Sequence, residues 1–499
     1  MPDDPPAAYD ELLDRYERIV NVGNARGLLS WDQQVMMPEG GTPARSKQLS
    51  TLSSLSHDLL TDDRVGELLD DLEDADLTVE QAGAVREIRR EYRRETRVPR
   101  DLVERISEAA SEALPVWESA RAEDDWDAFA PALEDLIELK REYAAHIDPD
   151  RDPYAVLFED YEPYLGLETA ERILGQLAAE LPPLIDDIRE SDVDLPRPFA
   201  GEFDPATQED LARDVLDALG YDWERGRLDT STHPFSMGTQ FDARVTTRFS
   251  PDDPLDSLYS TIHEFGHARY TLGLPQDQYG TPLGQPRDMT VHESQSRLWE
   301  NHVGRSRAFW AHFLPALVDR FPDLAGVDVD DLYAAANRVD PDNVIRVEAD
   351  ELTYHMHIVL RFEIERDLIA GNLAVEDVPQ VWNDKMAEYL GVRPETDSEG
   401  ALQDIHWSHG NFGYFPTYSM GSVLSAQLYA AADEAIDDLD EHLAAGEFEP
   451  LGDWLTTQVH RHGSRMTTDD LVKSATGESY AADHFLAYVT EKYGELYDL

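Results

Sequence analysis

Apolar residues recur at helical spacing along most of the chain. Near the N-terminus, Leu12, Tyr16 and Ile19 repeat every three or four positions, which places their side chains on one face of an α-helix. Proline and glycine interrupt the pattern at residues 37–41 and 148–153, where a helix does not readily continue. The N-terminal part is therefore predicted to consist of helical hairpins.

The pattern changes over residues 226–250. Thr, Phe and Val recur there in rough alternation, as at Val245, Thr247 and Phe249, and such alternation is typical of short β-strands. We predict a predominantly α-helical protein with this one small β region. Further helices are expected at residues 167–190, 206–219, 255–272, 289–315, 347–370 and 376–390.

The charge is abnormal: 42 basic and 103 acidic residues give a formal net charge of −61. A field of this sign opposes phosphate binding, so we expect no nucleic acid partner. Only five of the basic residues are lysines. Acidic, lysine-poor chains resemble proteins adapted to molar salt, where the Debye length falls to about 3 Å and self-repulsion is screened. We expect a halophilic protein; an acidic mesophilic protein is the alternative.

The chain has no cysteine, which excludes disulfides, thiolate metal ligands and a cysteine nucleophile. A metal site must then use His, Asp or Glu. Residues 1–6 do not resemble a signal peptide, and no run of 18 or more apolar residues occurs. We expect a soluble cytoplasmic protein without a membrane partner.

The segment His263-Glu264-Phe265-Gly266-His267 is an HExxH pattern. On a helix, residues four apart lie about 40° from each other on one face, so both imidazoles can bind one zinc ion. Leu258 and Ile262 precede the motif at helical spacing. Two histidines with purely structural roles are the alternative interpretation.

A catalytic zinc site needs a third protein ligand and an open position for water. The metzincin extension would place Gly at 270 and His at 273, but the chain has Tyr270 and Gly273, which excludes that class. A glutamate on a following helix is the other common solution. Glu293 lies there, after a Gly- and Pro-rich loop, but spacing alone leaves Glu300 as a competitor.

Six motifs in order give the chain a family resemblance. It resembles the metallocarboxypeptidases typified by thermostable carboxypeptidase Taq. The matching motifs are HPF at 233–235, DxRxT at 242–246, HExxH at 263–267, HESQ at 292–295, IRxxAD at 345–350 and GxxQDxHW at 400–407.

This resemblance implies a large, two-lobed helical zinc peptidase with a deep active-site cleft, usually a homodimer, that removes single residues from peptide C-termini. It implies that His263, His267 and Glu293 bind one zinc ion per chain, although Co²⁺ or another divalent metal is an alternative. We expect a single body over residues 1–499. Within it, 1–190 would form a mainly helical N-terminal lobe and 191–499 the zinc-binding catalytic part.

By the same resemblance, five residues receive catalytic roles. Glu264 is the expected general base and later the proton donor to the leaving amine. His233, His406, Tyr414 and Tyr418 are candidate donors to the developing oxyanion. As bare sequence, each of these four is more often a core or loop residue with a structural role.

A carboxypeptidase must bind the free C-terminal carboxylate of its peptide substrate, and a guanidinium offers a bidentate fork. Arg346 and Arg244 are the candidates by resemblance. The structural alternatives are internal pairs, Arg346 with Asp350 and Arg244 with Asp242. For Arg346 we favour the substrate role, whereas for Arg244 the two interpretations are balanced.

Two other functions are compatible with an HExxH motif followed by a glutamate. A zinc oligopeptidase or aminopeptidase would need an open groove or an acidic cluster that binds an amine. A non-catalytic helical scaffold with a structural metal would need a fourth protein ligand.

Overall fold

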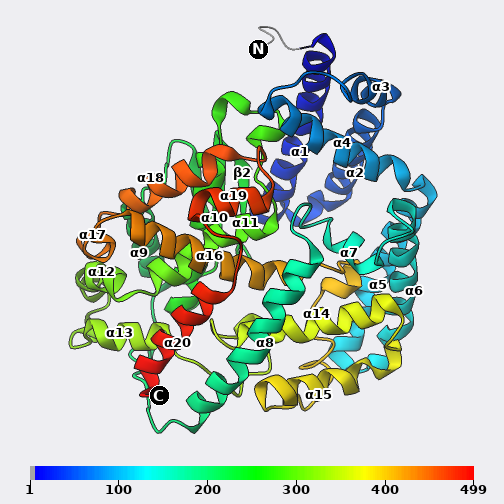
Figure 1. Ribbon diagram of the computed structural model, residues 1–499. Coiled ribbons are helices and arrows are strands. Elements are labelled where there is room, and N and C mark those ends of the chain that lie inside the picture. The colour runs from blue at the N-terminus through cyan, green and yellow to red at the C-terminus, as the bar shows by residue number, and fades with distance from the viewer. Residues whose placement is uncertain (1–5) are drawn as a thin grey trace. The chain divides into compact units, whose positions relative to one another are not determined.

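The computed structural model describes residues 6–499, and these residues are predominantly helical, as predicted (Figure 1). They form two compact units, each assembled from three segments of the chain. The first unit contains residues 6–96, 196–336 and 428–479, and the second contains 97–195, 337–427 and 480–499. The contiguous lobes expected at 1–190 and 191–499, and the cleft expected with them, stay predictions.

The first unit contains the predicted β region and the two segments that carry the HExxH and HESQ motifs. Its elements are α1 (Ala7–Val35), α2 (Thr42–Leu60), α3 (Asp63–Asp71), α4 (Val79–Arg97), α9 (Pro205–Ala218), β1 (Gly226–Thr230), β2 (Ser236–Thr239), β3 (Asp242–Thr247), α10 (Pro254–Gly273), α11 (Met289–Arg297), α12 (Arg307–Arg320), α13 (Val329–Ala336), α17 (Leu439–Ala445), α18 (Glu449–Gln458) and α19 (Thr468–Thr476).

The second unit is helical throughout its regular elements. These are α5 (Arg100–Glu123), α6 (Trp126–Ile147), α7 (Pro153–Phe158), α8 (Leu167–Glu190), α14 (Tyr354–Ala370), α15 (Val378–Leu390), the first part of α16 (Pro416–Ala435) and α20 (Asp483–Tyr497).

The three strands form one small mixed sheet in the order β1-β3-β2. β3 pairs in parallel with β1 and antiparallel with β2. Ala243, Val245 and Thr247 alternate along β3 and are fully buried, which is the period expected of one face of a strand. The helix α10, which carries the HExxH motif, packs beside β2 and β3.

The N-terminal periodicity corresponds to a real core. Leu12, Tyr16 and Ile19 of α1 are buried together with Leu68 of α3 and Ile88 of α4. Their burial confirms that the apolar spacing marks the inward face of each helix.

Two helices differ from their predicted bounds. The expected helix at 289–315 is interrupted after a π-helical segment, η4 (Leu298–Gly304), and Ser306 then caps α12 by accepting a hydrogen bond from the backbone N–H of Phe309. The helix expected from 347 begins only at Tyr354, because the Asp350 side chain accepts from the backbone N–H groups of residues 352 and 353. Apolar periodicity does not detect such polar interruptions.

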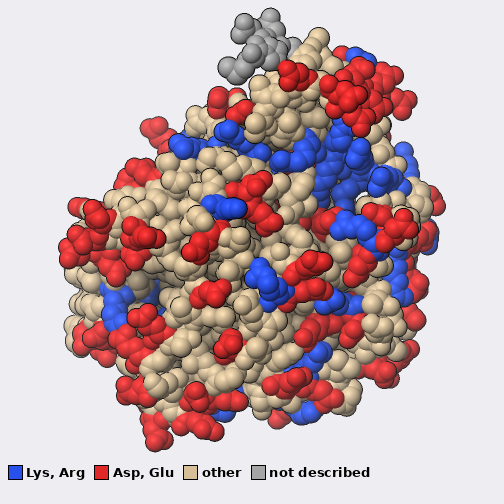
Figure 2. All heavy atoms as spheres, viewed as in Figure 1, with Lys and Arg blue, Asp and Glu red and all other residues tan. Residues whose placement is uncertain are grey.

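Acidic side chains are spread over the face of the molecule in Figure 2, whereas basic ones gather mainly where Figure 1 places α4. Among residues 6–499, none of the helices is both long and apolar enough to cross a bilayer.

Candidate active site

The helix α10 places the two histidines of the HExxH motif one turn apart. It begins at Pro254, and the side chain of Asp253 caps it by accepting from the backbone N–H of Asp256. The rings of His263 and His267 lie 4.9 Å apart between centroids and are nearly perpendicular, at 82°. Both imidazoles therefore lie on one face of the helix, as the spacing predicts.

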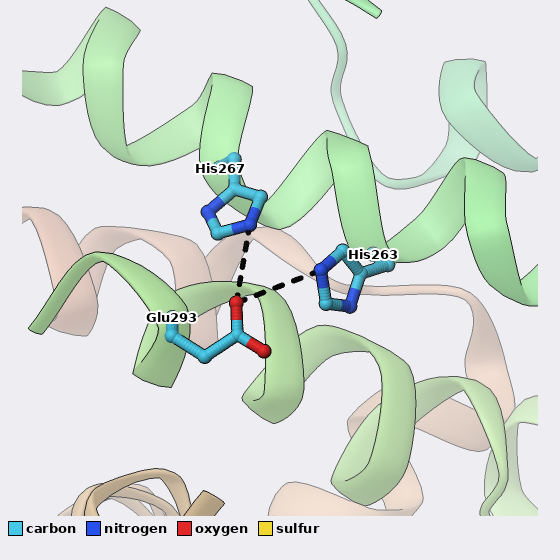
Figure 3. Close-up of side chains that lie close together, drawn as sticks. All are labelled: His263, His267 and Glu293. Atoms are coloured by element: carbon cyan, nitrogen blue, oxygen red, sulfur yellow. Dashed lines mark ion pairs between the residues drawn. The ribbon is translucent and has the colours of Figure 1, made fainter. Parts of the chain in front are cut away.

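Glu293 completes a group of three potential metal ligands. It lies on α11, and its Oε2 is 3.6 Å from Nε2 of His263 and 3.4 Å from Nε2 of His267 (Figure 3). Tetrahedral ligands at about 2.1 Å from a zinc ion are about 3.4 Å from one another. The spacing and the two-imidazole, one-carboxylate donor set fit one divalent metal ion.

A glycine lets α10 and α11 approach closely at this point. A Cβ atom on Gly266 would lie 2.5 Å from the carbonyl oxygen of Gln295 and 2.6 Å from Cα of Ser296. Both contacts would be with backbone, which cannot rotate away. The glycine inside the HExxH motif thus permits Glu293 to reach the histidines.

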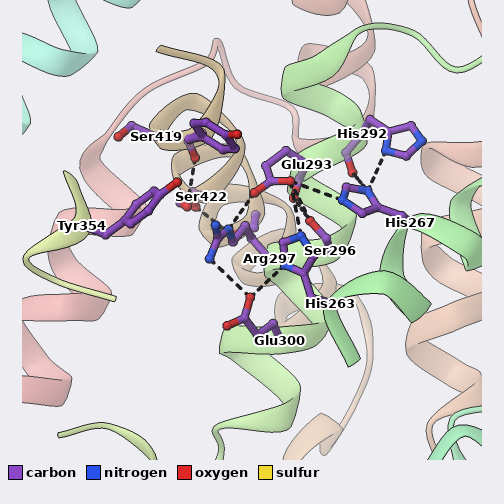
Figure 4. A network of polar contacts seen from close by, with 12 residues as sticks. His263, His267, His292, Glu293, Ser296, Arg297, Glu300, Tyr354, Ser419 and Ser422 are labelled. Atoms are coloured by element: carbon purple, nitrogen blue, oxygen red, sulfur yellow. Dashed lines mark hydrogen bonds and ion pairs between the residues drawn. The ribbon is translucent and has the colours of Figure 1, made fainter. Parts of the chain in front are cut away.

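Each histidine also has a partner on its other ring nitrogen (Figure 4). Nδ1 of His263 is 2.9 Å from Oε2 of Glu300. Nδ1 of His267 is 3.1 Å from the carbonyl oxygen of His292 and 2.6 Å from its Nδ1. Burial lowers the pKa of His292 to about 3, so this imidazole is neutral. These contacts leave both Nε2 atoms directed at Glu293.

Arg297 links Glu293, one of the three potential ligands, to Glu300. Its Nε donates to Oε1 of Glu293 at 2.8 Å, and its Nη1 lies 3.3 Å from Oε2 of Glu300. Burial opposes ionisation of both carboxylates, but Arg297 and His263 hold both pKa values well below the usual range. Both glutamates are therefore anionic at neutral pH.

Glu264 and His233 lie in the same unit as the three potential ligands. Glu264 is buried on α10, 7% exposed, and contributes no atom to the ligand group. His233 lies in the exposed loop between β1 and β2, where its carbonyl oxygen accepts from Oγ of Ser231 at 2.6 Å. Within the described part of the chain, His233 does not belong to the ligand group.

Arg346 lies in the second unit, and its carboxylate partner is not Asp350, the partner considered from the sequence. Its Nη2 and Nε lie 2.7 and 3.0 Å from Oδ1 of Asp404, and its Nη1 donates to the hydroxyl of Tyr354 at 3.1 Å. Asp350 instead caps the residues that precede α14. The alternative pair of Arg346 with Asp350 is therefore wrong, because the guanidinium pairs with Asp404 instead.

Asp404 is shared with a second guanidinium. Nε of Arg361 donates to its Oδ2 at 2.7 Å, and Arg361 is fully buried on α14. Burial opposes ionisation, yet Arg361 and Arg346 hold the pKa of Asp404 well below its usual range. We refer to Arg346, Arg361 and Asp404 as the arginine cluster. Its three ion-paired groups carry two positive charges and one negative charge.

His406, Tyr414 and Tyr418 gather beside the arginine cluster in the second unit. The His406 ring stacks on Tyr414, with centroids 5.6 Å apart, and its Nε2 is 3.5 Å from the hydroxyl of Tyr418. The Arg346 guanidinium lies over the Tyr418 ring at 5.4 Å. Burial lowers the pKa of His406 to about 4. Four residues predicted from the sequence are therefore neighbours: Arg346, His406, Tyr414 and Tyr418.

Arg361 and Glu365 were not predicted from the sequence. Glu365 is fully buried on α14 and accepts from Nε1 of Trp407 at 2.9 Å, the backbone N–H of Gly413 at 3.0 Å and the hydroxyl of Tyr154 at 3.0 Å. It thereby contacts both ends of the segment from Trp407, which follows His406, to Gly413, which precedes Tyr414. Neither residue belongs to a motif, whereas Asp404 lies inside GxxQDxHW and could have been chosen.

Arg244 makes the internal pair weighed against a substrate role. Its Nη2 and Nε lie 2.6 and 2.9 Å from the carboxylate of Asp242. Its guanidinium also lies over the ring of Trp31 in α1, at 4.5 Å from the centroid. Arg244 thus joins β3 to α1 within the first unit.

Comparison with known proteins gives one family. The family model for carboxypeptidase Taq (M32) metallopeptidases matches residues 11–493. Thermostable carboxypeptidase 1 of Thermus thermophilus is 39% identical over 99% of both chains. Thermostable carboxypeptidase 1 of Pyrococcus furiosus is 38% identical over 97% of this chain and 98% of its own.

Solved structures agree with the sequence comparison. The M32 carboxypeptidase from Deinococcus radiodurans superposes with a TM-score of 0.95 and 39% identity, covering 99% of this chain and 100% of its own. The similarity in fold between the two proteins therefore extends over nearly every described helix and strand.

Proposed function

Since this chain belongs to the carboxypeptidase Taq (M32) family of metallopeptidases, we propose that it releases single amino acids from peptide C-termini at a zinc ion bound by His263, His267 and Glu293. The chain is a metallocarboxypeptidase, a hydrolase that acts on peptides. The metal identity, the direction of cleavage in steps of one residue and the residue roles below are the proposed parts.

The geometry of the three ligands carries the proposal. Two Nε2 atoms face one carboxylate oxygen at 3.4 and 3.6 Å, and zinc is the metal that such a set most often binds in peptidases. Zinc bound there would lower the pKa of water toward about 7 and polarise the scissile carbonyl. Cobalt or another divalent ion is the alternative occupant.

Glu264 moves the proton in this scheme. Its carboxylate accepts a proton from the attacking water and then gives it to the nitrogen of the leaving amine. Its position next to His263 on the same helix, and its burial, support this role.

Arg346 binds the free C-terminal carboxylate of the peptide. The positive excess of the arginine cluster supports an anionic ligand, because one carboxylate, Asp404, faces two guanidinium groups. Arg244 is a secondary candidate, since its Nε and Nη2 already lie against Asp242.

His406, Tyr414 and Tyr418 donate hydrogen bonds to the substrate or to the developing oxyanion. A neutral imidazole and two phenols beside Arg346 support this role. His233 stays a prediction of the same kind, supported by its motif alone.

Digestion of one peptide of known sequence tests the proposal. Mass spectrometry is expected to show products shortened one residue at a time from the C-terminus. Chelation of the metal should abolish the reaction, and added zinc should restore it. Internal fragments, or losses from the N-terminus, would instead identify an oligopeptidase or aminopeptidase.

The net charge of −61 supports adaptation to high salt. The melting temperature is then expected to fall as salt is lowered from molar concentration to about 0.1 M, because repulsion is less screened. A flat response would contradict this. A homodimer and a cytoplasmic location stay predictions, the first open to sedimentation analysis and the second to fractionation of the source cells.

A further inference from the structure

Glu300 occupies an unusual position for a residue that binds no metal itself. It lies seven residues after Glu293, on the π-helical segment η4 that extends α11, and it is 7% exposed. π-Helical turns are rare and occur frequently at functional sites. The sequence alone had left Glu300 as a competitor of Glu293 for the metal.

Both oxygens of Glu300 are engaged within the first unit. Oε2 faces Nδ1 of His263 at 2.9 Å and Nη1 of Arg297 at 3.3 Å, and Oε1 accepts from Nη2 of Arg305 at 2.9 Å. Glu300 therefore contacts His263 on the side away from Glu293 and pairs with Arg297 (Figure 4). Arg305 contacts its other oxygen.

The two histidines differ in the partner of Nδ1. His263 faces the anionic carboxylate of Glu300, whereas His267 faces the carbonyl and imidazole of His292. A carboxylate partner fixes the tautomer and ring orientation of a metal-binding imidazole and strengthens it as a ligand. The metal bond to His263 should therefore depend on a single outer residue.

We propose that Glu300 is a positioning residue of the metal centre, which orients His263 and determines how tightly the metal ion is retained. This role rests on the proposed metal ligands. It also explains the polar connection through Arg297, whose Nε holds Oε1 of the ligand Glu293 at 2.8 Å. Loss of the Glu300 charge would leave Arg297 and Arg305 less compensated beside a bound cation.

Metal transfer from the holoenzyme tests this role without relying on activity. The zinc-loaded protein is mixed with excess chromogenic chelator, and the transfer rate and the competition dissociation constant are measured. Glu300→Gln is expected to weaken zinc binding about 10- to 100-fold. Glu300→Asp keeps the charge but shortens the reach to His263, so an intermediate loss is expected.

Glu87→Gln is the matched control. Glu87 is also 7% exposed and forms a buried pair with Arg287 in the same unit, with contacts of 2.9 and 3.0 Å. The control loses a buried glutamate–arginine pair without touching a metal ligand, so its zinc affinity should stay within about twofold of the wild type. Circular dichroism checks that each variant is folded.

A spectroscopic measurement separates positioning from general loosening. In the cobalt-loaded protein, Glu300→Gln should change the visible d–d bands, because the His263 ring is no longer held, whereas Glu87→Gln should not. Wild-type affinity and spectra in folded Glu300→Gln, or in Glu300→Asp if the first variant does not fold, would overturn the proposal. Full zinc retention by His263→Ala would instead contradict the metal site itself.

Discussion

The arginine cluster and the region around the three potential metal ligands have opposite formal charge. We call the second the metal region; it comprises His263, Glu264, His267, Glu293, Arg297, Glu300 and Arg305. In the metal region, the carboxylates of Glu293 and Glu300 pair with the guanidinium groups of Arg297 and Arg305. The carboxylate of Glu264, which interacts with His263, brings the count to three negative charges against two positive ones. When both imidazoles are neutral, as metal binding requires, the balance is −1, and their two Nε2 lone pairs are directed at Glu293. Such a site favours a cation.

The arginine cluster has two guanidinium groups against the one carboxylate of Asp404, a balance of +1 among its ion-paired groups. Such a site favours an anionic ligand, and the C-terminal carboxylate of a peptide is such a ligand. The difference is consistent with the proposed roles, in which the metal region performs the chemistry and the arginine cluster recognises the substrate. Changes in the metal region should lower kcat, and changes in the arginine cluster should lower discrimination between substrates.

The largest expected effect lies in the metal region. Glu264→Gln keeps the size of the side chain but cannot accept the proton of water, so kcat should fall about 10²- to 10⁴-fold. Zinc content, measured by atomic absorption, should stay at that of the wild type, whereas His263→Ala should lose the metal. Normal turnover by Glu264→Gln would remove the chemical role assigned to this region.

In the arginine cluster, Asp404→Asn should chiefly reduce stability. Removal of the carboxylate shared by two buried guanidinium groups is expected to cost about 3 to 5 kcal/mol in the free energy of unfolding, measured in urea at pH 7. Asp242→Asn is the matched control, because the Asp242 side chain is 48% exposed and exposed pairs contribute about 1 kcal/mol or less.

The stability difference between wild type and Asp404→Asn should depend on pH. Arg361 and Arg346 depress the pKa of Asp404 in the folded state, against the effect of burial. The contribution is therefore complete above the unfolded pKa of about 3.9 and is lost as pH falls toward the folded value. A gap that widens on acidification would contradict the depressed pKa.

Recognition by Arg346 should appear in the choice of substrate. Amidation of a peptide C-terminus removes the carboxylate and with it a charge-assisted contact to the Arg346 guanidinium, which Asp404 continues to pair, a loss of about 2 to 5 kcal/mol. This corresponds to roughly 30- to several-thousand-fold in kcat/KM. Acetylation of the N-terminus should change little.

Arg346→Ala sharpens this test. The variant should hydrolyse the free-acid peptide slowly, yet its poor rate on the amide should match that of the wild type, because the same contact is missing in both. An equal loss on both peptides would assign Arg346 to the stability of the cluster rather than to recognition.

Sequence reasoning predicted the metal region better than the arginine cluster. His263 and His267 lie four residues apart on one helix, so local geometry alone placed them together. Spacing could not separate Glu293 from Glu300, since residues seven apart share a helix face. Only the packing of α11 against α10 distinguishes Oε2 of Glu293, beside both Nε2 atoms, from Oε2 of Glu300, beside one Nδ1.

The arginine cluster depends on contacts distant in sequence. Arg346 and Asp404 are 58 residues apart, and Arg361 and Asp404 are 43 apart. No periodicity reports such pairs, so the sequence offered Asp350, the local choice, for Arg346. Arg361 and Glu365 belong to an apparently ordinary buried helix, and only the structure relates them to the loop of His406.

The glycine of the HExxH motif did give a sequence signal, because glycine inside a helix often marks a close backbone approach. Gly266→Ala should test whether close helix approach is needed here, with the smallest effect of the series. The new Cβ would meet the backbone of Gln295 and Ser296 at 2.5 and 2.6 Å, and overpacking of this kind costs about 1 to 3 kcal/mol.

Gly23→Ala in α1 is the control, since nothing lies within 4 Å of its added Cβ and alanine favours a helix by about 1 kcal/mol. Urea unfolding should thus show opposite signs for the two variants. In Gly266→Ala, α11 should also be displaced from α10, so zinc should transfer to a chelator faster than in Gly23→Ala. If both variants are equally stable and retain zinc equally, close helix approach is not what brings Glu293 to the histidines, and the metal region would owe its geometry to the polar contacts of Arg297 and Glu300 alone.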